Sequence, residues 1–246
     1  MSLQVAPING THIHYCQTGP KDGPALVFSN SLGTDLRIWN DVAPAFADRF
    51  NVITYDKRGH GLSGIGGADY NIDLHANDLI GLLDYLGVKD VIICGLSVGG
   101  LIAQKVTELA PERVRGLILC DTAPKLGDAD GWNTRINAIK EGGIEVLGDA
   151  IIERWLSPTY RRDRPVETAM YRDMLVRTTV EGYVGTCIAL RDGGPSRCGN
   201  PDFGAGPLYL RIGRSGDTAR CRARDGRDDP RCPIRTYKRG RAFAVP

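Results

Sequence analysis

The sequence of 246 residues has only four histidines, and all of them lie in its first third, at His12, His14, His60 and His75. Any chemistry that needs a histidine later in the chain therefore finds none. No apolar run approaches the roughly 20 residues that a membrane-spanning helix requires, so we expect no membrane partner. Residues 1–7 have neither a basic region nor an apolar stretch, which predicts a protein without a secretory signal, located in the cytoplasm.

Metal and nucleotide motifs are also missing. The seven cysteines are an odd number without CxxC or zinc-site spacing, and Cys94 and Cys120 lie in apolar runs typical of reduced core thiols. No Gly-x-Gly-x-x-Gly opens the first helix, and there is no Walker loop. We expect no metal and no cofactor. Nothing in the sequence predicts an oligomeric state.

Glutamate is absent from residues 193–246. This segment has eleven Arg and one Lys against five Asp, a net charge of +7, whereas the rest of the chain carries −5. It also holds nine Gly and six Pro, and only residues 207–212 resemble a strand. We expect an aberrant, disordered tail that supplies no well-packed strands.

Two interpretations of this tail compete. A basic, disordered arm would bind nucleic acid. Alternatively, GC-rich coding DNA translated in a wrong reading frame would yield the same excess of Arg, Gly, Pro and Ala. Aromatic residues are few and the charges do not repeat, so the second interpretation is favoured and no nucleic-acid partner is expected.

Strands and helices alternate along the first half of the chain. Short apolar runs typical of buried strands occur at residues 11–16, 25–28, 52–55, 91–94 and 116–121. Helical spacing of apolar residues appears between them, most clearly at residues 73–86 and 98–110. This alternation predicts an α/β protein with a doubly wound, mostly parallel sheet.

The strand pattern stops after Pro124, and residues 132–156 and 165–190 have helical spacing. An all-helical insertion at this point is well placed to cover the sheet edge where such folds bind ligands. We therefore divide the chain into residues 1–124, the first part of the core; residues 125–192, a helical cap; and the tail, residues 193–246.

Residues 91–100 read Val-Ile-Ile-Cys-Gly-Leu-Ser-Val-Gly-Gly, an apolar run that leads into Gly-x-Ser-x-Gly and then a helix. This is the strand–turn–helix context of a nucleophile elbow, which predicts Ser97 as a catalytic nucleophile. The Val98 N–H would donate to the oxyanion of a tetrahedral intermediate. A second donor usually comes from the loop after an earlier strand, and Leu32, in Asn-Ser-Leu-Gly-Thr, is our candidate. A glycine-rich turn without catalytic function is the alternative at both places.

Residues 56–63, Asp-Lys-Arg-Gly-His-Gly-Leu-Ser, follow another strand. We favour a structural role, in which Asp56 and Arg58 brace the turn by charge-assisted hydrogen bonds, over His60 as a base near the site. His75 opens a helix and is expected to face solvent. His12 and His14 share one face of an early strand, remote from the edge where the chemistry occurs.

Trp132 and Arg135 begin the helical insertion. Facing the sheet, they would contact an acyl or carboxylate group of a substrate. The alternative is a packing role for Trp132 and a solvated charge for Arg135, and it is slightly favoured. Both residues are kept as candidate substrate contacts.

Residues 1–192 resemble the α/β-hydrolase superfamily and, within it, the 3-oxoadipate enol-lactonases. Five stretches carry the resemblance: residues 28–39, 55–63, 94–100, 121–125 and 180–187. The elbow is shared by the whole superfamily, whereas the Asn-Ser-Leu-Gly-Thr loop and the Glu-Gly-Tyr segment narrow the match. The resemblance implies a cytoplasmic, cofactor-free esterase of bacterial aromatic catabolism that opens a small enol-lactone to 3-oxoadipate.

The same resemblance implies that Ser97 attacks the lactone carbonyl, with an aspartate-steadied histidine as its base. In the family the aspartate and histidine follow the cap, but residues 193–246 contain no histidine and no assignable aspartate. We expect the chain to use Ser97 inefficiently. Another small-ester or lactone hydrolase and an inactive, binding pseudo-hydrolase remain as alternatives.

Overall fold

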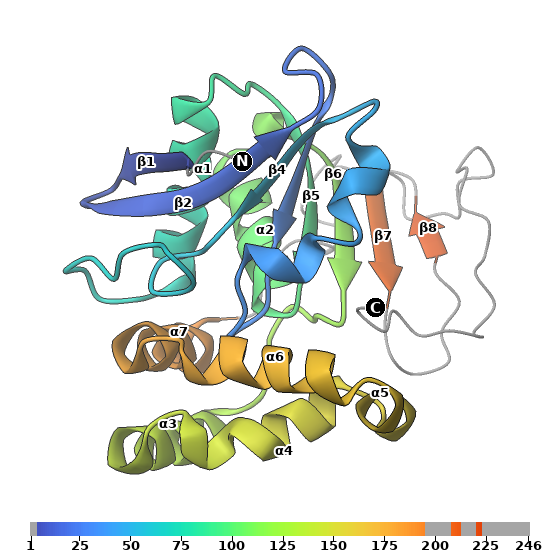
Figure 1. Ribbon diagram of the computed structural model, residues 1–246. Helices are drawn as coiled ribbons and strands as arrows, with labels where there is room; N and C mark the ends of the chain where they lie inside the picture. Colours follow the sequence, from blue (N-terminus) through green and yellow to red (C-terminus); the bar gives the residue numbers. More distant parts are fainter. Residues whose placement is uncertain (1–3, 195–207, 213–219, 223–246) are drawn as a thin grey trace.

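The computed structural model describes residues 4–194, 208–212 and 220–222 (Figure 1). Within these ranges eight strands form one sheet in the order β1-β2-β4-β3-β5-β6-β7-β8. The strands are β1 (Gln4–Ile8), β2 (Thr11–Thr18), β3 (Ala25–Ser29), β4 (Asn51–Tyr55), β5 (Val91–Leu96), β6 (Val114–Cys120), β7 (Leu208–Ile212) and β8 (Arg220–Arg222). From β4 to β7 the strands are parallel, which confirms the predicted α/β-hydrolase sheet.

The parallel strands are buried on both faces because their alternate residues serve two cores. On β3, Val27 belongs to one apolar cluster, whereas Leu26 and Phe28 belong to the other. On β5, Ile93 and Cys94 divide in the same way. Continuous apolar runs are what such doubly covered strands require, and this is why the sequence revealed them.

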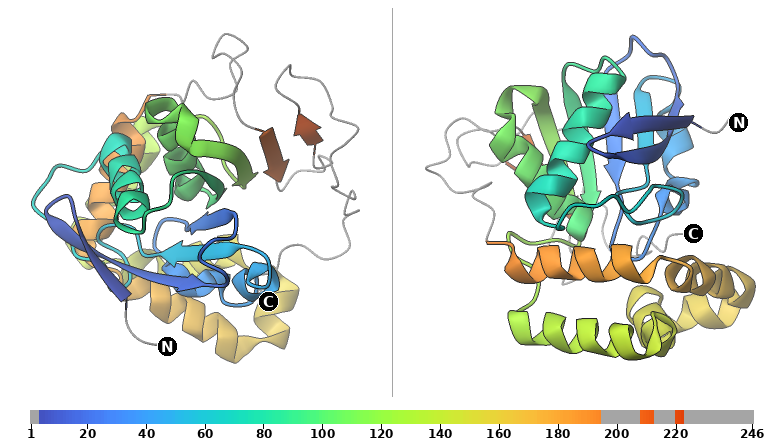
Figure 2. Two further views of the ribbon diagram at one scale, coloured as in Figure 1. Left: turned by 90° about the horizontal axis from the view of Figure 1, so that it is seen from above. Right: turned by 90° about the vertical axis from the view of Figure 1, so that its left-hand side faces the viewer.

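Different helices cover the two faces (Figure 2). The long helices α1 (Ile72–Tyr85) and α2 (Val98–Leu109) pack on the first cluster and against each other. The short 3-10 helices η1 (Leu36–Trp39) and η2 (Ala43–Phe46) supply the second cluster, and η3 (Pro111–Arg113) leads into β6. Helix α1 begins where the Asn71 side chain accepts a hydrogen bond from the Leu74 N–H at 2.7 Å, an N-cap that satisfies one free donor of the first turn.

The antiparallel edge of the sheet differs from the prediction. Strand β1 was not among the predicted strands, and its Pro7 is unfavourable in most strands. It pairs with β2 across a tight turn at Asn9 and Gly10, whose φ angles are both positive (45° and 73°). Strand β2 then pairs antiparallel with β4. Pro7 is tolerated because β1 is an edge strand.

Five helices form a layer at the end of the sheet toward which the parallel strands run (Figure 1). They are α3 (Ala129–Gly142), α4 (Glu145–Trp155), α5 (Pro158–Asp163), α6 (Pro165–Val176) and α7 (Val180–Asp192). Helix α3 contacts α7 and α4, and α4 contacts α6. This layer, called the cap below, lies over the carboxyl ends of the strands, where open α/β sheets bind their ligands.

Two segments of the tail form strands. Leu208–Ile212 forms β7 in parallel register with β6, and Arg220–Arg222 forms β8, antiparallel to β7. Strand β7 falls within residues 207–212, the one stretch of the tail that resembled a strand, whereas β8 was not predicted; backbone pairing at a sheet edge does not require an apolar side-chain pattern. The predicted disorder and the basic-arm interpretation concern residues outside the described ranges. Among the described helices, none is long and apolar enough to cross a membrane.

Candidate active site

Ser97 occupies the turn between β5 and α2 in a backbone conformation that few residues other than glycine adopt, with φ 55° and ψ −118°. Its N–H donates to the Cys120 carbonyl at 3.0 Å, and its own carbonyl accepts from the Thr122 hydroxyl at 2.7 Å. These bonds to the end of β6 hold the strained residue in place. The predicted strand–turn–helix context of the serine is present.

Gly99 is required for the close approach of this turn to β3. A Cβ atom at position 99 would lie 2.1 Å from the Ser29 carbonyl oxygen and 3.0 Å from that of Asn30. No side chain fits there without moving backbone. The second glycine of Gly-x-Ser-x-Gly therefore brings the start of α2 against the end of β3, from which the Leu32 loop continues.

The two predicted oxyanion donors lie on these neighbouring segments. Val98 is the first residue of α2, so its N–H has no acceptor inside its own helix. Leu32 is the second residue of a turn that the Thr34 N–H closes on the Ser31 carbonyl at 3.4 Å, with φ 73° at Gly33. The turn hydrogen bond does not use the Leu32 N–H. The assignment of both amides to an oxyanion hole stays a prediction.

The cap contacts this turn through Tyr183 of α7. A Cβ atom at Gly33 would lie 2.8 Å from the Tyr183 ring, so the ring rests directly on the turn. Arg135 of α3 places its guanidinium 5.3 Å from the centre of the Trp132 ring, and its charge opposes the rise that burial causes in the pKa of Tyr183. Trp132 in turn donates to the Leu126 carbonyl at 2.8 Å. The contact of Trp132 and Arg135 with a substrate stays a prediction. Tyr183 was not predicted as a site residue, although it belongs to the Glu-Gly-Tyr segment that carries the family resemblance.

Comparison with known proteins agrees with this geometry. Residues 24–139 match the family described as alpha/beta hydrolase fold. The chain is 37% identical to 3-oxoadipate enol-lactonase 2 of Acinetobacter baylyi over 180 residues, covering 73% of this chain and 67% of the relative. The crystal structure of the enol-lactonase from Burkholderia xenovorans LB400 superposes with a TM-score of 0.80 at 35% identity, covering 85% of this chain and 80% of that one.

The chain belongs to the enol-lactonase family of α/β-hydrolases. As a member it is a hydrolase of ester or lactone bonds. A second relative, 3-oxoadipate enol-lactonase 1 of the same organism, is 31% identical over 191 residues, covering 77% of this chain and 71% of the relative.

In this enol-lactonase family member no histidine has a recorded contact with Ser97 among the described residues. His60 and His75 are both buried. Burial, reinforced by the charge of Lys57, lowers the pKa of His60 well below its usual value. Burial likewise lowers the pKa of His75 to about 3. Both rings are therefore neutral at physiological pH.

Two predictions about the histidines are wrong. His75 does not face solvent, because α7 covers it and places the Thr186 hydroxyl 3.4 Å from its Nε2. His14 is not remote from the carboxyl edge of the sheet. Strand β2 runs antiparallel to β4, so His14 lies beside Asp56 just beyond β4, with Nδ1 2.7 Å from the carboxylate. His12 is exposed.

Residues 56–63 form a braced loop, but Asp56 and Arg58 each use other partners. The Asp56 carboxylate accepts from the N–H groups of Leu36 and Leu62 at 2.7 and 2.9 Å, in addition to His14. Arg58 is buried and makes a bidentate pair with Asp78 of α1, with both distances 2.8 Å. The loop thus has the predicted structural role, because its side chains connect β2, η1 and α1.

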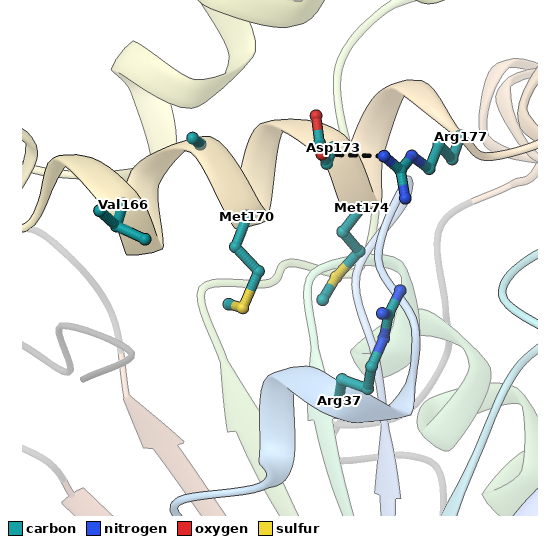
Figure 3. A pocket seen from close by; sticks show the side chains of 7 residues that line it. Arg37, Val166, Met170, Asp173, Met174 and Arg177 are labelled. Carbon is teal, nitrogen blue, oxygen red and sulfur yellow. Dashed lines mark hydrogen bonds and ion pairs between the residues drawn. The ribbon is translucent and has the colours of Figure 1, made fainter.

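A groove of about 330 Å³ opens between α6 and η1 (Figure 3). Met170 and Met174 point from α6 toward η1, where Arg37 lies. The two arginines that line the groove form ion pairs, Arg37 with Asp35 and Arg177 with Asp173. None of the residues that line it belongs to the elbow or the Leu32 turn. In the described part of the chain, no three metal-ligating side chains gather into a possible metal site.

Proposed function

We propose that the chain hydrolyses 3-oxoadipate enol-lactone to 3-oxoadipate, with Ser97 as nucleophile. The observation that carries the proposal is the elbow, in which Ser97 adopts a strained conformation directly before α2. The name of the two curated relatives supports the substrate. On the same support, we place the reaction in the β-ketoadipate pathway of bacterial aromatic catabolism, in the cytoplasm.

The reaction runs through an acyl-enzyme. Ser97 Oγ attacks the lactone carbonyl, a base takes the hydroxyl proton, and the amides of Val98 and Leu32 stabilise the oxyanion. The ring C–O bond then breaks, and the leaving enolate oxygen takes a proton and becomes a ketone by tautomerisation. Water hydrolyses the acyl-enzyme, so one lactone and one water give one 3-oxoadipate.

The reaction lacks the histidine that usually serves as its base, because no histidine follows Ser97 in the chain. Removing one member of a catalytic triad leaves roughly 10³- to 10⁴-fold acceleration over water, which arises from the oxyanion hole and binding. We expect this chain to accelerate hydrolysis over water by a factor of the same order. A small base from solution, such as imidazole, should accept the Ser97 proton and raise the rate.

Arg135 would hold the carboxylate of the substrate's acetate arm. The other cap arginines with described partners, such as Arg172 and Arg191, are committed to carboxylates. Among the described residues Arg135 has no carboxylate partner and lies over the Trp132 ring, so its charge is available to an anion. Its guanidinium matches the planar geometry of a carboxylate.

The test follows the ultraviolet absorbance of the enol-lactone with the purified full-length chain and imidazole, against the same solution without protein. We expect hydrolysis of the lactone in preference to p-nitrophenyl acetate, and Arg135→Met should raise KM for the lactone but not for the acetate ester. Cleavage of the simple ester with the lactone untouched would show a different esterase. No turnover of either substrate would favour the pseudo-hydrolase.

A further inference from the structure

Lys57 is a buried cation whose bonds converge on one short turn. It lies two residues after the end of β4 and is 1% exposed. Its Nζ donates to the Ser31 carbonyl and, at 3.3 Å, to the Thr34 carbonyl. These two oxygens belong to the first and last residues of the turn that contains Leu32.

No carboxylate within ion-pair distance explains this burial in the described part of the chain. The adjacent Asp56 is occupied by two backbone N–H groups and His14, and Asp35 is paired with Arg37. A cation buried without an ion pair is costly, so it must be retained for the hydrogen bonds that it makes. Those bonds end on the Leu32 turn.

The geometry of one peptide group shows what the bonds accomplish. The Ser31 carbonyl and the Leu32 N–H belong to the same planar, trans peptide, so they point in opposite directions. When Lys57 binds the carbonyl oxygen, it fixes the N–H to point away from Lys57. Rotation of this peptide would turn the oxygen toward the site and remove a donor from the oxyanion hole.

We propose that Lys57 is a positioning residue of the oxyanion hole, which aims the Leu32 N–H by holding the carbonyl at the other side of the same peptide. The inference rests on the proposed function, because it assigns the Leu32 amide to the oxyanion. Lys57 itself does not touch the substrate.

The charges around Lys57 support this role. Burial lowers the pKa of Lys57 to about 7, against the opposing influence of the Asp56 and Asp35 carboxylates. The neighbouring His60 and His75 are neutral and add no repulsion at physiological pH. The ammonium form donates the stronger hydrogen bonds to the carbonyls.

Replacement of Lys57 by methionine should leave the fold intact. The Thr34 carbonyl still accepts from Asn30 Nδ2 at 2.6 Å, and the Ser31 carbonyl still accepts from the Thr34 hydroxyl at 2.9 Å. These donors belong to the turn itself and keep it closed, whereas Lys57 ties the Ser31 carbonyl to the loop that follows β4. Exchange of a buried charge for an apolar side chain of similar shape is often neutral or stabilising. Loss of activity without loss of stability would therefore distinguish positioning from a structural role.

The experiment compares the full-length chain, Lys57→Met, Lys57→Gln and the matched control Lys105→Met. Lys105 lies on α2, where it pairs with Glu108 and Asp73 and contacts no part of the turn. With p-nitrophenyl acetate and imidazole, Lys57→Met should lower kcat by about 10² while KM stays within about twofold, because the lost interaction is made only in the transition state. Lys57→Gln, which keeps a donor, should lie between, and Lys105→Met should match the wild type.

Hydrogen–deuterium exchange of residues 30–36 gives a second readout that needs no catalysis. We expect faster exchange at this segment in Lys57→Met, with unchanged exchange in α1 and an unfolding temperature at or above that of the wild type. Unchanged exchange at the turn would overturn the proposal, as would equal kcat in an active protein. If the wild type has no turnover, the function fails, and the exchange result still decides the role of Lys57.

Discussion

The buried side chain of His75 makes the stability of this protein sensitive to acid. His75 has a pKa lowered to about 3, mainly by burial and further by the charges of Lys57 and Arg58. In the unfolded chain its pKa is near 6.5. Between these values the unfolded state binds more protons, so the free energy of unfolding falls as pH is lowered from 6.5 toward 3.

His75→Gln should reduce this acid sensitivity. From the two pKa values, neutral His75 costs about 2 kcal/mol of stability when pH falls from 7 to 5. Urea unfolding at both pH values should show a loss that is smaller in the variant by about that amount. The control is His12→Gln, because His12 is exposed and its replacement should leave the loss unchanged. An equal loss in His75→Gln and the wild type would contradict a buried neutral ring.

The sequence predicted the function of single residues where a local motif indicates it. Ser97 was identified because the glycines around it define the turn, and Leu32 because its loop follows a strand. Lys57 was missed, since nothing in a sequence distinguishes a buried lysine from a solvated one. The burial of His75 depends on α7, and its Thr186 contact lies 111 residues away in sequence.

At the scale of elements, the elbow depends on the fit between α2 and β3. Gly99 provides this fit because its hydrogen faces the Ser29 carbonyl at a distance that excludes a methyl group. The contact is backbone on both sides, so neither partner yields by a change of rotamer. The position of Ser97 and that of the Leu32 turn are therefore coupled.

Gly99→Ala should displace the elbow. Overpacking of this kind typically costs about 1–3 kcal/mol, and thermal unfolding should reveal it as a lower Tm. Gly67→Ala is the matched control, because a Cβ atom there meets nothing within 4 Å, and surface changes usually stay within about 0.5 kcal/mol. If both variants unfold at the wild-type temperature, the close approach of α2 to β3 is wrong.

The predictability of an element followed the strength of its apolar pattern. Parallel strands such as β3 and β5 are buried on both faces and gave continuous runs. Strand β1 has one covered face and a proline, and β8 lies in a segment of unfavourable composition, so neither was predicted. Strand β7 coincides with the apolar stretch at residues 207–212, but its partner strand is visible only in the sheet.

At the scale of the whole molecule, contacts of the cap with the core include one at Gly59 and one at Gly33, in the turn that contains Leu32. The Thr179 hydroxyl donates to the Gly59 carbonyl at 3.1 Å, which connects the start of α7 to the loop at residues 56–63. The Tyr183 ring rests on Gly33 one helical turn later. These contacts connect the cap, which holds the predicted substrate contacts, to the turn that holds the predicted oxyanion donor Leu32.

This arrangement was predictable in outline only. The helical composition of residues 125–192 indicated a cap, and the resemblance indicated its family, but no local pattern links Tyr183 to a turn 150 residues earlier.

We infer that Ser97 is a nucleophile without a histidine base. The initial rate of enol-lactone hydrolysis should be measured with increasing imidazole, in the full-length chain and in Ser97→Ala. Without imidazole the two proteins should differ little, because loss of either partner of a triad costs nearly as much as loss of both. With imidazole, the rate of the wild type should rise above that of imidazole alone, whereas the rate of Ser97→Ala should not. An equal rise in both proteins, or none in the wild type, would contradict the claim.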